Sequence, residues 1–274
     1  MIGSRREAIV GRLVLIVVLI VTILPLISML SAALQPADRN PTGLVWPTDP
    51  QWINFVTAFQ AGHVLELMVS SLGIVLIVVP ASVLIATMAG YALGNLRIPG
   101  NRFILLAFVV GLTIPFESLI IPIYYQMQSL GLLNTPWSVG FALIGLFMPF
   151  SVAWMRAHFV GVPVELSEAA RVDGATVWQE FRRVQLPLAG PAISALAILL
   201  FLWTWNQFIL PVVLIQDPLD RTVAGALTFF QGQYYASIPL LNAGALIIIT
   251  PAIIVFLIFQ RQFIRALLQG AVKG

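Results

Sequence analysis

The sequence is dominated by long apolar stretches. Six of them run for about 20 residues or more, and each is therefore long enough to cross a hydrocarbon core of ~30 Å as an α-helix. Hydrophobic residues make up 59% of the chain and charged residues only 9%, whereas charged residues are about a quarter of soluble domains. The sequence thus predicts an all-α membrane protein with six transmembrane helices and excludes a water-soluble enzyme. The expected spans are 13–34, 65–93, 103–125, 137–158, 188–215 and 241–259, with kinks expected at the prolines inside them, among them Pro115, Pro122 and Pro211.

Basic residues fall almost entirely on one side of these expected spans. Of the 14 Lys and Arg residues, only Arg39 and Arg221 lie in segments that would face the other side. Basic residues of short loops stay on the cytoplasmic side, so we expect both termini to be cytoplasmic. The first apolar run also exceeds the 7–15 residues of a signal-peptide core, which predicts a retained helix.

Several kinds of chemistry are excluded by residue counts. The chain has no Cys and only two His residues, His63 and His158, which lie too far apart for a His-based metal site. A Walker A loop needs a Lys followed by Ser or Thr, but the only lysine, Lys273, precedes Gly274 at the chain end. We therefore expect no metal site, no nucleic-acid binding and no enzyme activity. The energy for transport would come from a partner ATPase, an ion gradient or the substrate gradient.

The longest expected cytoplasmic segment, residues 159–187, predicts two short helices. Pro163 suits the first turn of one helix, and Gly174 suits the left-handed conformation that closes it. Thr176 and Gln179 form a capping-box pattern for the second helix, which we expect Pro187 to end. Taken alone, these features are equally typical of an ordinary pair of helices on a membrane surface.

Particular residues of this segment resemble the EAA loop of the membrane subunits of bacterial ABC importers. The resemblance lies in the Glu-Ala-Ala run, the Asp-Gly pair after it and the later Leu186-Pro187. It implies that the loop docks on an ATP-hydrolysing subunit and couples hydrolysis to transport. Small alanines allow another surface to approach closely, and a glutamate offers a carboxylate to a basic partner. The implied coupling residues are Glu168, Ala169, Ala170, Arg171, Asp173 and Gly174.

Residues 65–274 are similar to one branch of this family, the carbohydrate-uptake permeases related to the smaller maltose-transporter membrane subunit. Residues 1–64 match that branch by hydropathy alone, so we expect an N-terminal part and a core permease domain of five helices. The resemblance implies the type I ABC importer permease fold in a bacterial inner membrane, surrounded by lipid. Residues that carry it include Tyr91, Leu130, Gly131, Trp205, Asn206 and an ATPase-contacting tail of Gly270, Ala271, Val272, Lys273 and Gly274.

The same resemblance implies a set of partners. These are a second homologous permease, a dimer of cytoplasmic ABC ATPase subunits that bind ATP and Mg, and an extracytoplasmic solute-binding protein. This chain would bind no cofactor itself. It would move a sugar or sugar derivative, such as an oligosaccharide, an amino sugar or a glycerophosphate-like compound.

Four polar or aromatic residues within expected spans are candidates for the substrate path. A charge at mid-membrane costs on the order of 3 kcal/mol, so Glu117 marks either a path or the solvated outer end of its helix. Asn206 and Gln207 beside Trp205 offer amides and an aromatic face that suit a sugar. Hydrogen bonding between helices explains the same amides as well.

Two other classes of membrane protein compete with this interpretation. An ion-coupled secondary transporter would show paired acidic residues or unwound helices at repeated positions, and here Glu117 is essentially the one candidate carboxylate. A membrane-embedded enzyme would need a constellation of His, Asp or Ser within the spans, which two peripheral histidines do not supply.

Overall fold

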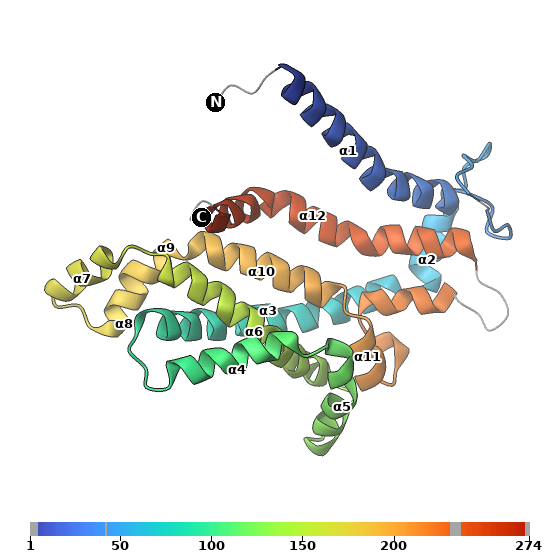
Figure 1. Cartoon of the computed structure of the whole chain (residues 1–274). Coiled ribbons are helices and arrows are strands. Elements are labelled where there is room, and N and C mark those ends of the chain that lie inside the picture. Colours follow the sequence, from blue (N-terminus) through green and yellow to red (C-terminus); the bar gives the residue numbers. More distant parts are fainter. Residues whose placement is uncertain (1–4, 42, 231–236, 272–274) are drawn as a thin grey trace. The chain divides into compact units, whose positions relative to one another are not determined.

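The computed structural model describes residues 5–41, 43–230 and 237–271, and within these ranges it contains helices and no strands. Figure 1 shows the order of the helices along the chain. The chain forms two compact units, one of residues 1–65 with 226–251 and the other of residues 66–225 with 252–274. The expected division at residue 64 into an N-terminal part and a core permease domain concerns functional parts and stays a prediction.

Four of the described helices are long and apolar enough to cross a membrane unbroken. Two further candidates are pairs of helices that are bent at a short break, by 101° and 71°. The structure therefore gives four spans, or up to six if each bent pair is one span. The unbroken helices are α1 (Arg5–Ala33), α3 (Val64–Asn95), α6 (Pro136–Val160) and α12 (Ile238–Ala271).

The expected third span, 103–125, is broken near Pro115, one of the prolines at which a kink is expected. It consists of α4 (Asn101–Thr113), a short 3₁₀ turn η1 (Phe116–Leu119) and α5 (Ile120–Ser129), with the bend of 101° between α4 and η1. Pro115 explains the break, because a proline disfavours helical backbone at the residue before it. Ile114 is extended accordingly, with ψ 122°.

The expected fifth span, 188–215, is also interrupted. It consists of α10 (Gly190–Trp205) and α11 (Ile209–Leu214), separated by three residues. Pro211 has no N–H to donate to the carbonyl of Gln207 four residues earlier, which weakens the helix across this point. The Thr222 hydroxyl donates to that carbonyl instead.

In the unit formed by residues 66–225 and 252–274, aromatic and aliphatic side chains of α3, α6 and α10 share one core. The helices α3 and α6 approach closely at Gly90, which has no Cβ. A Cβ there would lie only 2.6 Å from the Cβ of Met155. Small residues permit such contacts between membrane helices. The core includes Tyr91, Val152, Met155, Phe159, Phe181, Leu196 and Leu200.

The unit formed by residues 1–65 and 226–251 has a smaller core around α2 (Ile53–Ala61). Asn54, which is buried, donates to the carbonyls of Ala33 and Gln35 at 2.8 and 2.7 Å and so fixes α2 to the end of α1. The apolar side chains of α1 are exposed along residues 9–27. A membrane helix with such a surface is stable only where lipid or another membrane subunit covers it.

Candidate functional site

The first helix of the EAA loop, α7 (Val164–Val172), ends in a Schellman motif. The N–H of Gly174 donates to the carbonyl of Arg171 at 3.0 Å, and the N–H of Ala175 donates to the carbonyl of Ala170 at 2.9 Å. Gly174 has φ +78°, in the left-handed region. The predicted closure of this helix at Gly174 is confirmed.

The second helix begins as predicted and ends one residue past Pro187, where its end is predicted. Thr176 and Gln179 form the capping box, with hydrogen bonds of 2.8 and 3.3 Å. The helix then continues past Pro187, through α8 (Val177–Glu180), the π-helical turn η2 (Phe181–Gln185) and α9 (Leu186–Leu188). Pro187 has no N–H with which to continue the backbone hydrogen bonding, which fits an end of the helix at Leu188. The chain bends by 71° between this helix and α10.

The π-helical turn places two polar side chains in the interior of the loop. In an α-helix, residues five apart point about 140° away from each other, whereas the i to i+5 bonding of a π turn places them nearly above one another. Glu180 and Gln185 are both fully buried. The Nε2 of Gln185 donates to the Oγ of buried Ser167 in α7 at 2.8 Å.

An ion pair joins the two helices of the loop. The Nε of Arg171 donates to the Oε2 of Glu180 at 2.9 Å, and its Nη2 donates to Oε1 at 3.4 Å. The carboxylate side chain is 0% exposed, and the arginine side chain is 52% exposed. Burial acts to raise the pKa of Glu180, but hydrogen bonds from Arg171 and Ser167 outweigh it and lower this pKa below its ordinary value.

The buried polar residues of the loop were missed by sequence reasoning. Glu180, Gln185 and Ser167 carry no motif, and Arg171 is implied by the resemblance as a coupling residue rather than as a partner of Glu180. The one signal in the sequence is that Glu180 directly precedes an apolar position, Phe181, on a short helix. Pairing across nine residues between two helices cannot be read from spacing alone.

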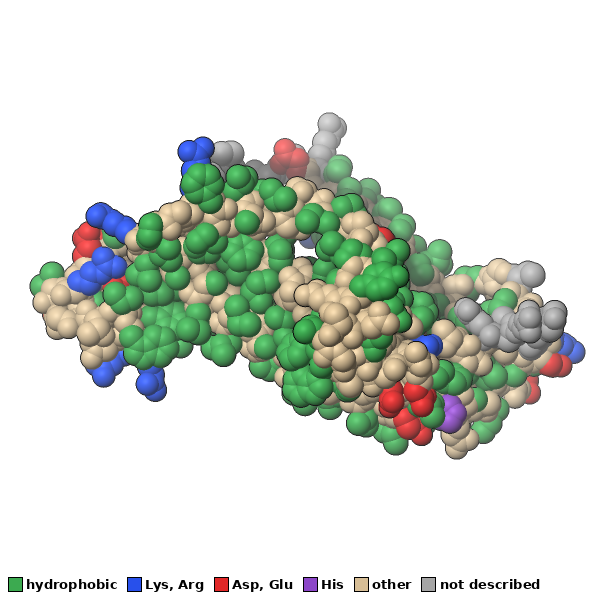
Figure 2. Space-filling view, turned by 90° about the horizontal axis from the view of Figure 1, so that it is seen from below, with side chains coloured by type: hydrophobic (Ala, Val, Ile, Leu, Met, Phe, Trp, Pro, Cys, Tyr) green, Lys and Arg blue, Asp and Glu red, His purple; other side chains and the backbone are tan. Residues whose placement is uncertain are grey.

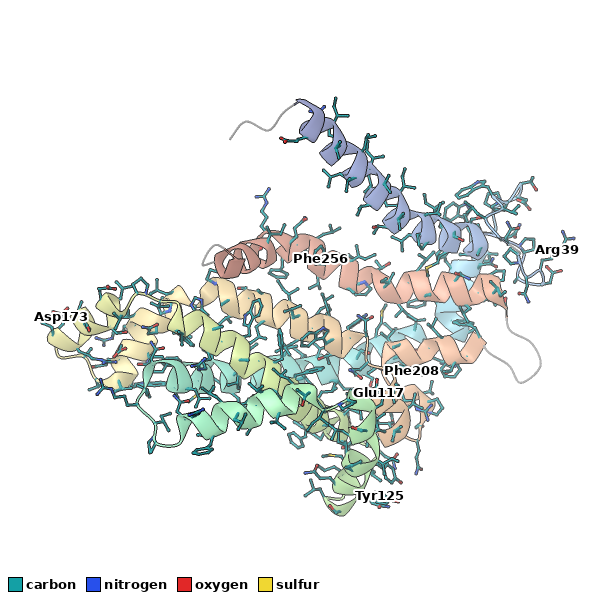
Figure 3. The ribbon with its side chains drawn as sticks, in the orientation of Figure 1. Arg39, Glu117, Tyr125, Asp173, Phe208 and Phe256 are labelled. Atoms are coloured by element: carbon teal, nitrogen blue, oxygen red, sulfur yellow. The ribbon has the colours of Figure 1, made fainter. Side chains whose placement is uncertain are left out.

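The outer surface of the loop combines charge with exposed apolar side chains. Glu168, Ala169 and Asp173 of the predicted coupling set are exposed, and Figure 3 shows Asp173 at the tip of the loop. Val172 is 87% exposed, and Trp178 is exposed on α8. Figure 2 shows charged side chains gathered at this end, next to helices that are covered by apolar side chains. Such a surface suits contact with another protein.

The four candidates for the substrate path differ in their exposure and in their hydrogen bonds. Glu117 lies in η1, directly after the break in the third span, and is exposed. Trp205 is 4% exposed and stacks on Phe201, with ring centroids 5.6 Å apart. The Nδ2 of Asn206 donates to the carbonyl of Leu202 at 2.8 Å, and Gln207 accepts at its backbone carbonyl from Thr222.

The breaks in the third and fifth spans lie in the same part of their unit. Phe116 of η1 and Leu210 of α11 belong to one apolar cluster, and α11 packs on α5. Figure 3 labels Glu117 and Phe208 beside these two breaks. Of the four candidates, Glu117 therefore offers an exposed carboxylate beside the two breaks. Trp205 and Asn206 make contacts within the C-terminal end of α10.

The expected ATPase-contacting tail, Gly270 to Gly274, begins inside a helix, and its contact with the ATPase stays a prediction. The backbone of α12 is helical to Ala271 and therefore includes Gly270 and Ala271. The preceding Ala-Leu-Leu-Gln run consists of good helix formers and explains the extension. Val272, Lys273 and Gly274 lie outside the described residues.

Relatives with known names are similar over nearly the whole chain. An arabinooligosaccharides transport system permease protein of Halalkalibacterium halodurans is 34% identical, covering 93% of this chain and 92% of its own. A trehalose transport system permease protein of Mycobacterium tuberculosis is 32% identical, covering 92% of this chain and 93% of its own.

A solved structure shares the fold. It is the crystal structure of a bacterial ABC transporter involved in the import of the acidic polysaccharide alginate, with a TM-score of 0.79 and 21% identity. The match covers 96% of this chain and 99% of that chain. The all-α type I permease fold predicted from the sequence is confirmed. Residues 82–269 match the family described as "Binding-protein-dependent transport system inner membrane component", and the chain is a member of that family of membrane transport permeases.

Proposed function

We propose that this chain is the permease subunit of an ATP-driven ABC importer that moves a sugar or sugar derivative across a bacterial inner membrane. The observation that carries the proposal is the EAA loop itself, whose first helix closes at Gly174 and presents Glu168, Asp173 and Val172 on its exposed surface. The named relatives, which are sugar transport permeases, support the substrate class. The ion-coupled alternative has no support from them.

The loop would couple transport to hydrolysis by rigid contact. A partner ATPase dimer, which binds ATP and Mg, would receive the exposed surface of α7 and move it on binding and hydrolysis. Because α7 is hydrogen-bonded to the helix that leads through a bend into α10, that motion would reach the bundle and switch access between its two sides. In this arrangement the chain itself hydrolyses nothing and holds no cofactor.

The remaining partners follow from the family. A solute-binding protein would deliver the sugar, and a second homologous permease would cover the exposed apolar surface that one subunit leaves. Both termini would be cytoplasmic, with the EAA loop on the same side. The two relatives are named for different sugars at nearly equal identity, so we propose the class of sugar and not a particular one.

Reconstitution of the assembled importer tests this function. Proteoliposomes that contain this permease, its partner permease, the ATPase and the binding protein should take up labelled oligosaccharide only when ATP reaches the ATPase. The matched controls omit the ATPase or the binding protein, one at a time. Uptake driven by a proton or sodium gradient without the ATPase would contradict the proposal and restore the secondary transporter.

A further inference from the structure

The buried carboxylate of Glu180 is the least expected charge in the EAA loop. It lies on a short helix in a segment that is otherwise rich in exposed polar residues, yet none of its side chain reaches the surface. A carboxylate in such a place is unstable unless charged or hydrogen-bonding groups surround it. The groups around this carboxylate therefore identify the helices that it connects.

Three helices meet at this carboxylate. From α7, Arg171 donates two hydrogen bonds to it and the Ser167 hydroxyl lies against it. From α3, the Tyr91 hydroxyl faces it, although this hydroxyl makes no hydrogen bond of normal geometry among the described residues. Gln185, one π turn further on, bonds to the same Ser167. The carboxylate thus lies between the exposed coupling helix and a membrane helix.

The ring of Tyr91 continues this connection into the core. Its centroid lies 4.9 Å from that of Phe181 and 5.6 Å from that of Phe159 on α6. All three rings are buried in the core that α3, α6 and α10 share. A displacement of α7 would therefore press on packed aromatic rings rather than on a flexible surface.

We propose that Arg171 and Glu180 form a brace that transmits movement of α7 to α3 and α6, so that Arg171 is a positioning residue and not a contact to the ATPase. The proposal rests on the proposed coupling function of the loop. It gives Arg171 a different role from the one that the family resemblance implies, because its Nε and Nη2 are engaged by Glu180. Docking then depends on the outer surface with Glu168 and Val172, and transmission depends on the brace.

The prediction is a loss of coupling without a loss of docking. We would compare Glu180→Leu, Arg171→Met and the double variant in the reconstituted importer. Leucine is similar in size to glutamate and carries no polar atom of its own, and Arg171, whose side chain is 52% exposed, can turn toward water once the carboxylate is gone, so Glu180→Leu tests the brace with little risk to folding. Each variant should lower the sugar transported per ATP hydrolysed by about tenfold, while co-purification of the ATPase stays within about twofold. The double variant should be no worse than either single variant, because both remove the same interaction.

A matched control is Arg183→Met, which removes an exposed arginine of the same segment and should leave the transport ratio unchanged. A nitroxide at Val172→Cys, in a chain without other cysteines, reports on α7 directly. It should become more mobile in Glu180→Leu and stay unchanged in Arg183→Met. This measurement does not depend on transport.

The results separate the possible failures. Normal coupling in Glu180→Leu together with a loss in Arg171→Met would show that Arg171 acts outside the loop, and the brace would be wrong. Additive losses in the double variant, or a label at Val172 that does not respond, would overturn it as well. Failure of the proposed function would instead appear in the wild-type importer, as uptake that needs no ATPase.

Discussion

The Thr222 hydroxyl donates a hydrogen bond to the backbone carbonyl of Gln207, the group that Pro211 leaves without an intrahelical donor. Thr222 is buried, so no water replaces this donor readily. We expect Thr222→Val, which keeps the shape and removes the donor, to lower the free energy of unfolding in detergent by about 1 kcal/mol.

The control for this variant is Thr22→Val. The Thr22 hydroxyl donates to the carbonyl of Val18 within the same helix, a carbonyl that the helix backbone already satisfies. An equal loss of stability in both variants would show that Thr222 has no special role at the break.

Membrane orientation can be tested with single cysteines, since the chain has none. Ser129→Cys, at the exposed end of α5, should react with an impermeant thiol reagent applied to intact cells. Val172→Cys, at a position of α7 that is 87% exposed, should react only after the membrane is opened. Ser167 is unsuitable for this purpose because it is buried and accepts from Gln185. Labelling of Val172→Cys in intact cells would reverse the orientation.

The turn at Gly174 should tolerate asparagine and reject valine. A Cβ at this glycine meets no atom within 4 Å, so any loss arises from the backbone, which is left-handed with φ +78°. That conformation costs roughly 1–2 kcal/mol for most residues and least for asparagine. We expect Gly174→Val to abolish ATP-driven uptake at a normal membrane level, and Gly174→Asn to keep most of it. Equal uptake by both variants would remove the coupling role of this turn.

The pKa of Glu180 sets how acid affects the stability of the loop. Because its folded pKa is below the unfolded value of about 4.3, its ionised form stabilises the fold above that unfolded value, and this contribution is lost as pH falls through the folded pKa. The melting temperature of the purified permease should thus fall more steeply with acid in wild type than in Glu180→Leu, with little difference between pH 6 and 8. Arg183→Met should follow wild type, and identical acid profiles for wild type and Glu180→Leu would contradict the assignment.

Glu117 is the path candidate that the structure leaves accessible. Loss of a hydrogen bond to a charged group is worth roughly 1.5–3 kcal/mol, so Glu117→Ala should lower sugar uptake on the order of tenfold while assembly with the ATPase is unchanged. Asn206→Ala, which removes an amide already bonded to Leu202, should affect stability more than uptake. Wild-type uptake by Glu117→Ala would place this residue at a solvated helix end without a transport role.

Local signals in the sequence predicted the local structure well. Gly174 and the Thr176–Gln179 capping box act through their own backbone neighbours, and both are found as predicted. Kinks at prolines inside the spans were expected, and breaks are found near Pro115 and Pro211, but hydropathy does not give the size of a bend such as the 101° of the third span. The pairing of Arg171 with Glu180 also escaped prediction, since it depends on how two helices fold onto each other. Which residues touch sugar or ATPase is a property of the assembled complex and stays a prediction.

The π-helical turn from Phe181 to Gln185 has a consequence for the register of the chain. A turn closed over five residues instead of four contains one residue more than a regular helix needs, and each residue turns an α-helix by about 100°. If these residues formed a regular α-helix with none removed, everything from Leu186 onward would rotate against the loop by that angle. The chain would keep its hydropathy and its motifs, but α10 would present a different face to its neighbours.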